Sequence, residues 1–118
     1  MIPHVDRPLV YIAAPYSSDP VGGTHRAIAV AERLEGTGLI TPVVPHLNLL
    51  WDLIYTHTND FWYSMDLALL DRCNALLRIP GVSPGADDEV IFAEEAEIEV
   101  FFEIDDLLAW AESFIATR

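Results

Sequence analysis

The chain has 118 residues and is 52% hydrophobic, which is typical of one compact domain and excludes a disordered chain. Its formal net charge of -13 opposes binding to nucleic acid backbones and to anionic membranes. No apolar run is long enough to cross a bilayer, and the first residues lack the layout of a secretory signal. We therefore expect a single cytoplasmic domain over 1–118, with neither membrane nor nucleic acid as a partner.

The first half of the chain predicts two strands, each followed by a polar turn or a helix. The run LVYIAAP at 9–15 predicts a buried strand, and the turn formers YSSDPVGGT follow at 16–24. Residues 25–38 have apolar side chains at helical spacing and a Gly-Thr-Gly stop, which predicts a helix. A second β-branched run at 39–46 leads into 47–60, which we expect to be an aromatic-rich loop or short helix.

The second half continues the alternation. We expect a helix at 61–74, a buried strand at 75–80, a helix at 86–97, a strand at 98–103 and an amphipathic helix at 105–117. Alternating strands and helices predict an α/β fold: a three-layer sandwich around a doubly wound, mostly parallel sheet of four or five strands, of the flavodoxin-like or Rossmann-like type. Such sheets bind their ligands at the carboxyl ends of the strands.

Polar and aromatic residues follow the first two strands. Tyr16, Ser17 and Ser18 stand before a helix whose free N–H groups could hold a phosphate or a sugar, although ordinary turn and capping roles explain them equally well. His46 and Trp51 follow the second strand; an aromatic ring can stack on a base, and a histidine can titrate or donate. A core or capping role is the alternative for both. The glycine-rich fingerprints of mononucleotide and dinucleotide sites are absent.

Acidic residues supply the candidate chemistry. Asp66 lies among apolar residues of its helix, where a carboxylate needs a reason, and the wall of a cleft would provide one. The turn PGVSPGADDEV then places Asp87, Asp88 and Glu89 together at the start of the next helix. Because successive helical residues turn by about 100°, one of these side chains can face water while its neighbour faces the cleft. We expect helix N–H groups to keep such a carboxylate ionised and able to attack carbon.

Four motifs follow one another along the chain: VYIAAPYSSD, PHLNLLW, YSMDLALLDRCNALLRIPG and SPGADDEVIFAEEAEIEVF. In this order they resemble the nucleoside 2-deoxyribosyltransferase-like superfamily, which includes the 2'-deoxynucleoside 5'-monophosphate N-glycosidases. The motifs span nearly the whole chain. The most telling part is an aspartate on a helix, then an apolar strand, then a glycine-containing turn that leads to a glutamate.

The resemblance implies roles for individual residues. It assigns Glu89 as the nucleophile that attacks the anomeric carbon and Asp66 as the residue that assists at the base or sugar. It places Tyr16 at the end of the first strand's loop and Ser83 where the monophosphate glycosidases contact the phosphate, with Gly85 in the turn beside it. It also implies a homodimer or homotetramer with shared active sites. We expect neither a metal nor a cofactor, since Cys73 is the only cysteine and no histidine pair has metal-ligand spacing.

The substrate and the activity itself stay open at this point. Asp87 and Asp88 stand where active members of the superfamily carry small or apolar residues, and Arg26 comes later than the arginine of the glycosidases' first loop. We therefore predict cleavage or transfer at the N-glycosidic bond of a nucleoside or a nucleoside 5'-monophosphate. The alternative is a nucleotide-binding or sensing module that keeps the fold without the chemistry.

Overall fold

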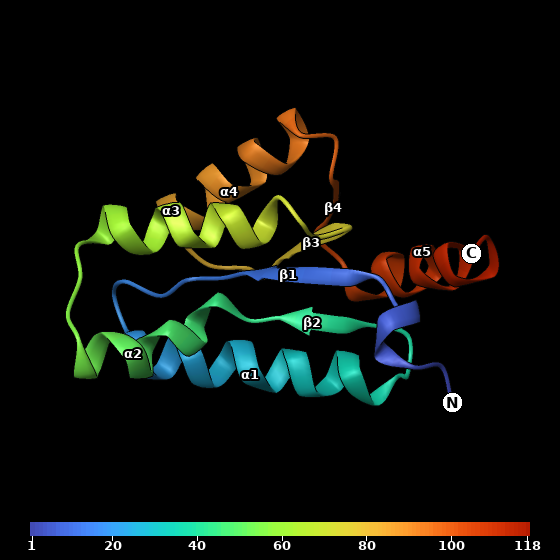
Figure 1. Cartoon of the computed structure of the whole chain (residues 1–118), viewed down its shortest axis with the longest axis horizontal. Helices are drawn as coiled ribbons and strands as arrows, with labels where there is room; N and C mark the ends of the chain where they lie inside the picture. The colour runs from blue at the N-terminus through green and yellow to red at the C-terminus, as the bar shows by residue number, and fades with distance from the viewer.

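The computed structural model describes residues 1–118 and consists of a four-stranded, fully parallel sheet flanked by five α-helices (Figure 1). The strand order is β2-β1-β3-β4. The strands are β1 (Leu9–Ala13), β2 (Thr41–Val43), β3 (Ala75–Arg78) and β4 (Glu99–Phe101). The α/β sandwich with a parallel sheet is confirmed, with four strands.

The helices form a layer on each face of the sheet. They are α1 (Pro20–Gly36), α2 (Asn48–Ile54), α3 (Asn59–Leu70), α4 (Pro84–Glu95) and α5 (Ile104–Ala116), with two short 3-10 helices at His4–Asp6 and Pro45–Leu47. Helix α1 lies on the opposite side of the sheet from α3 and α4 in Figure 1. Buried residues of α1 belong to one hydrophobic cluster with Leu107 and Ala111 of α5. Helix α5 therefore packs on the same face of the sheet as α1. No helix is both long and apolar enough to span a bilayer.

The central strand β1 divides the core into two halves. Val10 and Ile12 pack toward α1 and α5, whereas Tyr11 and Ala13 pack toward α3 and α4. This alternation follows from the two-residue period of a strand, and it explains why the run is apolar on both faces. Tyr11 pairs in register with Leu76 of β3, so its side chain lies at the middle of the sheet.

Several predicted boundaries shift for local reasons. Helix α1 begins at Pro20, five residues before the predicted start, because Asp19 caps it by accepting from the Gly22 N–H at 3.1 Å. Helix α3 begins at Asn59, where Thr58 caps it. The outer strands are shorter than predicted, and Pro42 within β2 is tolerated because β2 is an edge strand.

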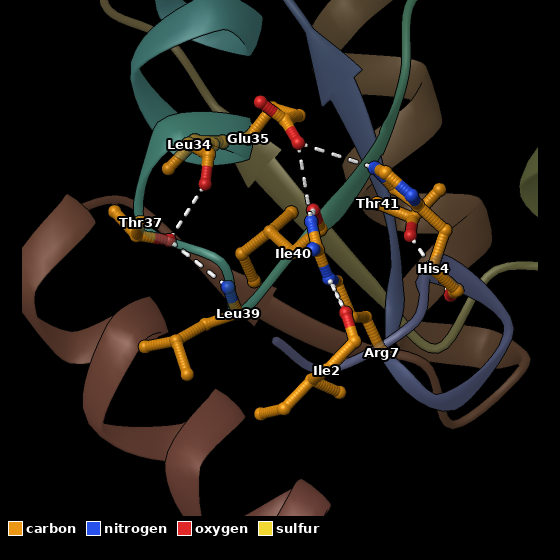
Figure 2. Close-up of polar contacts among 9 residues, drawn as sticks. All are labelled: Ile2, His4, Arg7, Leu34, Glu35, Thr37, Leu39, Ile40 and Thr41. Carbon is orange, nitrogen blue, oxygen red and sulfur yellow. Dashed lines mark hydrogen bonds and ion pairs between the residues drawn. The ribbon is translucent and has the colours of Figure 1, made fainter.

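A buried arginine ties the amino end of β1 to its neighbours (Figure 2). The Arg7 side chain is 1% exposed, and its Nε donates to the Ile2 carbonyl at 2.8 Å. Its guanidinium also donates to the Glu35 carboxylate at 3.3 Å and to the Ile40 carbonyl at 3.5 Å. These contacts join the first residues, the end of α1 and the approach to β2, at the end of the sheet remote from the strand carboxyl ends.

Replacing Arg7 by methionine should lower the free energy of unfolding by about 1–3 kcal/mol, because two carbonyls and a carboxylate lose their donor. Urea denaturation measures this change. The matched control is Arg72→Met on an exposed helix end, where we expect a change below about 0.5 kcal/mol. Equal losses in the two variants would show that the buried contacts of Arg7 contribute nothing.

Candidate functional site

A cavity of about 430 Å³ lies at the carboxyl ends of the strands, the end toward which β1 and β2 point in Figure 1. It is lined by Ala14, Tyr16 and Ser17 after β1, Pro45 and His46 after β2, Asn48 and Asp52 of α2, Asn59, Asp60, Trp62, Tyr63 and Asp66 of α3, and Ser83, Gly85, Ala86, Asp88 and Glu89 at α4. The location agrees with the rule for open parallel sheets.

Most of the sequence-predicted site residues meet in this cavity. They are Tyr16, Ser17, His46, Asp66, Ser83, Gly85 and Glu89. They come from four separate segments of the chain, and the parallel topology brings these segments to one end of the sheet. Their assembly gives the cavity carboxyl, hydroxyl, imidazole and aromatic groups.

Two predicted binding residues do not line the cavity. Ser18 is exposed in the loop after β1, and the amino end of α1 that it precedes is already satisfied by Asp19, whose carboxylate occupies the place expected for an anion. Trp51 lies on the outer side of α2, because Asp52 is the residue of that turn that faces the cavity. The Trp51 ring instead contacts Trp62 edge-on, with centroids 5.4 Å apart.

Glu89 is held by a tyrosine from the sheet. Ser83 caps α4 by accepting from the Ala86 N–H at 3.1 Å, and five residues into the helix Glu89 turns back toward β1. The Glu89 side chain accepts a hydrogen bond from the hydroxyl of Tyr11, which is fully buried. Glu89 itself is 8% exposed, so its carboxyl group contacts the cavity with little access to bulk water.

The three neighbouring acids of α4 have different surroundings. Asp87 points outward and pairs with the buried Arg78 guanidinium at 2.9 Å, while Arg78 also donates to the Gly81 carbonyl at 2.8 Å. Asp88 lines the cavity at its exposed rim, and Glu89 is buried at its wall. The mutual repulsion of the triplet is therefore reduced by separation onto different faces and by one arginine.

Burial raises the pKa of Glu89 to about 7 and the charge of Asp66 adds to this, whereas the hydrogen bond from Tyr11 and the charge of Arg78 lower it. The expectation that helix N–H groups keep this carboxylate ionised is wrong, because Glu89 lies beyond the first turn of α4, where the free N–H groups are. Desolvation is the larger effect. The group is consequently divided between its acid and its carboxylate near neutral pH.

Asp66 has a similar balance. Burial raises its pKa to about 7, and the hydrogen bond from the Asn48 side-chain amide, at 2.9 Å, lowers it. Since Asp66 and Glu89 also interact through their charges, the two titrate as a pair. The pair can hold one acid and one carboxylate at neutral pH, the combination that acid-assisted nucleophilic chemistry requires.

His46 is 5% exposed, and burial lowers its pKa, so the ring is neutral at pH 7. Its Nε2 lies 3.3 Å from the Pro15 carbonyl oxygen and must donate to it, because a carbonyl only accepts. The other nitrogen, Nδ1, is thus an acceptor, and no protein group donates to it. His46 thus contributes a neutral ring to the cavity wall, with Nδ1 enclosed by protein and without a hydrogen-bond partner.

Two glycines fix the loop after β1 that carries Tyr16 and Ser17. Gly81 has a φ of +128°, and a Cβ there would lie 2.6 Å from the Cγ of Pro15. A Cβ at Gly23 would lie 2.6 Å from the Pro15 carbonyl oxygen. The close approach of both segments to Pro15 therefore requires glycine, and it sets the position of the loop relative to α1 and the turn after β3.

The sequence reasoning missed Tyr11, which holds Glu89, and several residues that line the cavity, among them Asn48, Asp52, Asp60 and Trp62. Tyr11 gives a usable signal, because a tyrosine in the middle of a buried strand needs a partner for its hydroxyl. Asp52 accepts from the His57 backbone N–H at 3.0 Å and from the Trp62 indole N–H at 2.7 Å, and these hydrogen bonds lower the pKa of Asp52.

No group of three or more His, Cys, Asp or Glu side chains is arranged to hold a metal ion.

The chain matches no known family model, and it has no significant similarity to curated proteins or to solved structures. A fold of this class supports many unrelated activities. The functional conclusion therefore depends on the residues of the cavity and on their chemistry.

Burial of Glu89 predicts a specific dependence of stability on pH. Its folded-state pKa of about 7 exceeds the ordinary value of 4.5, so the folded protein binds more protons than the unfolded chain between these values. The stabilisation is present at low pH and is lost as the pH rises through about 7. Glu89→Gln should thus lose less stability than the wild type between about pH 5 and about pH 8.

Thermal unfolding at the two pH values measures this difference. The control is Glu95→Gln, an exposed glutamate at the end of the same helix, which should follow the wild-type pH dependence. If Glu89→Gln also follows the wild type, the carboxyl group of Glu89 has an ordinary pKa and the buried environment described above is wrong.

Proposed function

We propose that the protein cleaves, or transfers at, the N-glycosidic bond of a nucleoside or nucleoside 5'-monophosphate, with Glu89 as the nucleophile. The observation that carries this proposal is the pair Glu89 and Asp66: two carboxyl groups of raised pKa at the wall of one strand-end cavity. Such perturbed pairs are characteristic of catalytic sites. The ordered motifs that resemble the nucleoside 2-deoxyribosyltransferase-like superfamily support the same chemistry.

In the proposed reaction, the ionised Glu89 bonds to the anomeric carbon while the bond from that carbon to the base breaks. The electron pair of the broken bond goes to the base, and Asp66 in its acid form supplies the proton that a neutral base needs to leave. The transition state has oxocarbenium character, so the Glu89 carboxylate stabilises its positive charge. Water, or a second base, then bonds to the anomeric carbon as the bond from that carbon to Glu89 breaks and its electrons return to the carboxylate. The proton that the water or the incoming base loses goes back to Asp66.

Tyr11 is a positioning residue in this scheme. Its hydroxyl donates to Glu89, and burial together with the charge of Glu89 raises the pKa of the phenol, so it remains a donor throughout. The bond selects one orientation of the carboxyl group and favours its ionised form. Tyr11 thereby supplies a fixed hydrogen bond to a group that burial would otherwise neutralise.

The remaining cavity residues would hold the substrate. Tyr16, Ser17 and His46 are proposed to contact the sugar or base from one side, and Ser83 and Gly85 from the other. Trp62 takes over the stacking role first expected of Trp51, because Trp62 is the tryptophan that lines the cavity. No cofactor has a part in the proposed reaction.

Incubation with a panel of deoxynucleosides, ribonucleosides and their 5'-monophosphates, followed by chromatography, tests the proposal. The wild type should release free base, Glu89→Gln should lower the rate by at least about a thousandfold, and Asp66→Asn by about a hundredfold for neutral bases. Glu95→Gln serves as the control and should retain full activity. Tight binding of the panel without base release would favour the non-catalytic module, and equal release by Glu89→Gln would end the nucleophile assignment.

The pH dependence of base release tests the role of Tyr11. Tyr11→Phe removes the hydrogen bond that lowers the pKa of Glu89, so the pH at which base release rises should move upward in the variant. The pH profile of kcat/KM measures this shift. A lower rate with an unchanged profile would mean that Tyr11 affects only packing.

We also propose that the protein is a homodimer or homotetramer in which a second copy covers α2. This short helix leaves Leu50, Leu53 and Ile54 exposed near the cavity residue Asp52, and Tyr55, which follows the helix, is exposed as well. Contiguous exposed apolar side chains are typical of interaction sites. Light scattering tests the assembly: Leu53→Glu should convert an oligomer into monomers, and a monomeric wild type would contradict the proposal.

A further inference from the structure

The charges around the cavity are strongly unbalanced. Five of its 17 lining residues carry a carboxyl group, namely Asp52, Asp60, Asp66, Asp88 and Glu89, and none is a lysine or arginine. His46 is the one basic side chain among the lining residues, and its ring is buried and neutral. An enclosure of this composition attracts cations and repels anions.

The nearest cation cannot offset this charge. All basic side chains of the chain, apart from histidine, are arginines, and Arg78 is the one whose charge reaches Glu89. The Arg78 guanidinium is committed to Asp87 and to the carbonyls of Ile79 and Gly81, and it does not line the cavity. The dipole of α4 places a partial positive charge of about half a unit at the start of the helix. The negative charge of Asp88, in the next turn of the same helix, opposes it.

The aromatic wall of the cavity is also suited to a cation. Trp62 and Tyr63 line it, and the indole N–H of Trp62 donates to the Asp52 carboxylate at 2.7 Å. Tryptophan is the best cation–π partner among the side chains, and the negative charge of Asp52 at the indole edge adds to the attraction. Tyr16 and His46 also line the cavity, and their rings meet edge-on with centroids 5.5 Å apart.

We propose that the cavity selects N-glycosides whose aglycone is a positively charged planar ring, such as a pyridinium or an N-alkylated purine, and whose sugar carries no phosphate. This inference rests on the proposed function and narrows its substrate class. Five carboxyl groups and an anion-polarised tryptophan would surround the cationic ring, while a 5'-phosphate would meet no free basic side chain.

The bond changes are simpler for such a substrate. Glu89 bonds to the anomeric carbon, and the bond from that carbon to the cationic ring nitrogen breaks with both electrons moving to the nitrogen. The positive charge of the ring is cancelled by those electrons, so the aglycone leaves neutral and takes no proton. Water later bonds to the anomeric carbon while the bond from that carbon to the Glu89 oxygen breaks, and both electrons of that bond restore the Glu89 carboxylate. The proton lost by the water goes to solvent. Asp66 then serves as a counter-ion instead of an acid.

Three ribosides with the same pyridine ring test the selection. Nicotinamide riboside is cationic and has no phosphate, nicotinic acid riboside carries a carboxylate in place of the ring amide, and nicotinamide mononucleotide adds a 5'-phosphate to the sugar. Calorimetry with Glu89→Gln measures binding without turnover. We expect nicotinamide riboside to bind at least about tenfold more tightly than either of the others, with a preference that weakens as salt is added.

Charge variants identify the origin of the preference. Asp60→Asn removes one carboxylate from the first turn of α3 at the cavity, and in the Glu89→Gln background it should reduce the preference by about threefold. Asp106→Asn makes the same change in the first turn of α5, outside the cavity, and should leave the preference intact. Equal effects of the two variants would overturn the assignment of selectivity to the cavity.

Base release by the wild type separates this inference from the proposed function. Selective binding of nicotinamide riboside without release of nicotinamide would support the charge selection and contradict the enzymatic activity. Release of base from the phosphorylated or acidic compounds as fast as from nicotinamide riboside would support the activity and overturn the charge selection. Failure of all three ribosides to bind would overturn the inference directly.

Discussion

The contact between Tyr11 and Glu89 connects the core of this protein to its candidate chemistry. Tyr11 lies in the central strand of the sheet and is fully buried, so its hydroxyl requires a partner inside the molecule. Glu89 provides that partner and is thereby withdrawn from water. Burial raises the pKa of this carboxyl group into the physiological range, where it can change its protonation state. One interaction thus satisfies the hydroxyl of a core residue and fixes the surroundings of a carboxyl group in the cavity wall.

The two ends of the sheet have opposite electrostatic designs. At the amino ends of the strands, Arg7 uses its charge to satisfy carbonyls and Glu35, and these contacts fasten the start of β1. At the carboxyl ends, the cavity collects carboxyl groups and leaves them without arginine partners. Unbalanced charge costs stability, because like charges repel. Its concentration at the strand ends, on loops and helix starts carried by a rigid sheet, is what a binding site requires and a structural core does not.

The alternation of buried apolar runs with helical patterns was sufficient to predict the α/β fold, and the strand-end rule was sufficient to direct attention to the segments that meet in the cavity. The contacts of the site were beyond the sequence. Asn48 meets Asp66, and Asp52 meets Trp62, only because the fold brings α2 and α3 to the same strand-end cavity. The raised pKa of Glu89 also depends on burial, which no local pattern reports, and the sequence likewise could not show that Trp62, and not Trp51, lines the cavity.

A direct determination of the Glu89 pKa tests the central claim most sharply. Carbon-13 NMR of the side-chain carboxyl carbons, assigned with Glu89→Gln, follows each titration separately. The account predicts a midpoint for Glu89 near the value of about 7 that its environment produces, moved upward in Tyr11→Phe. A midpoint at the ordinary value of 4.5, unaffected by loss of the Tyr11 hydroxyl, would mean that the carboxyl group is solvated and that neither the buried contact nor the proposed nucleophile exists.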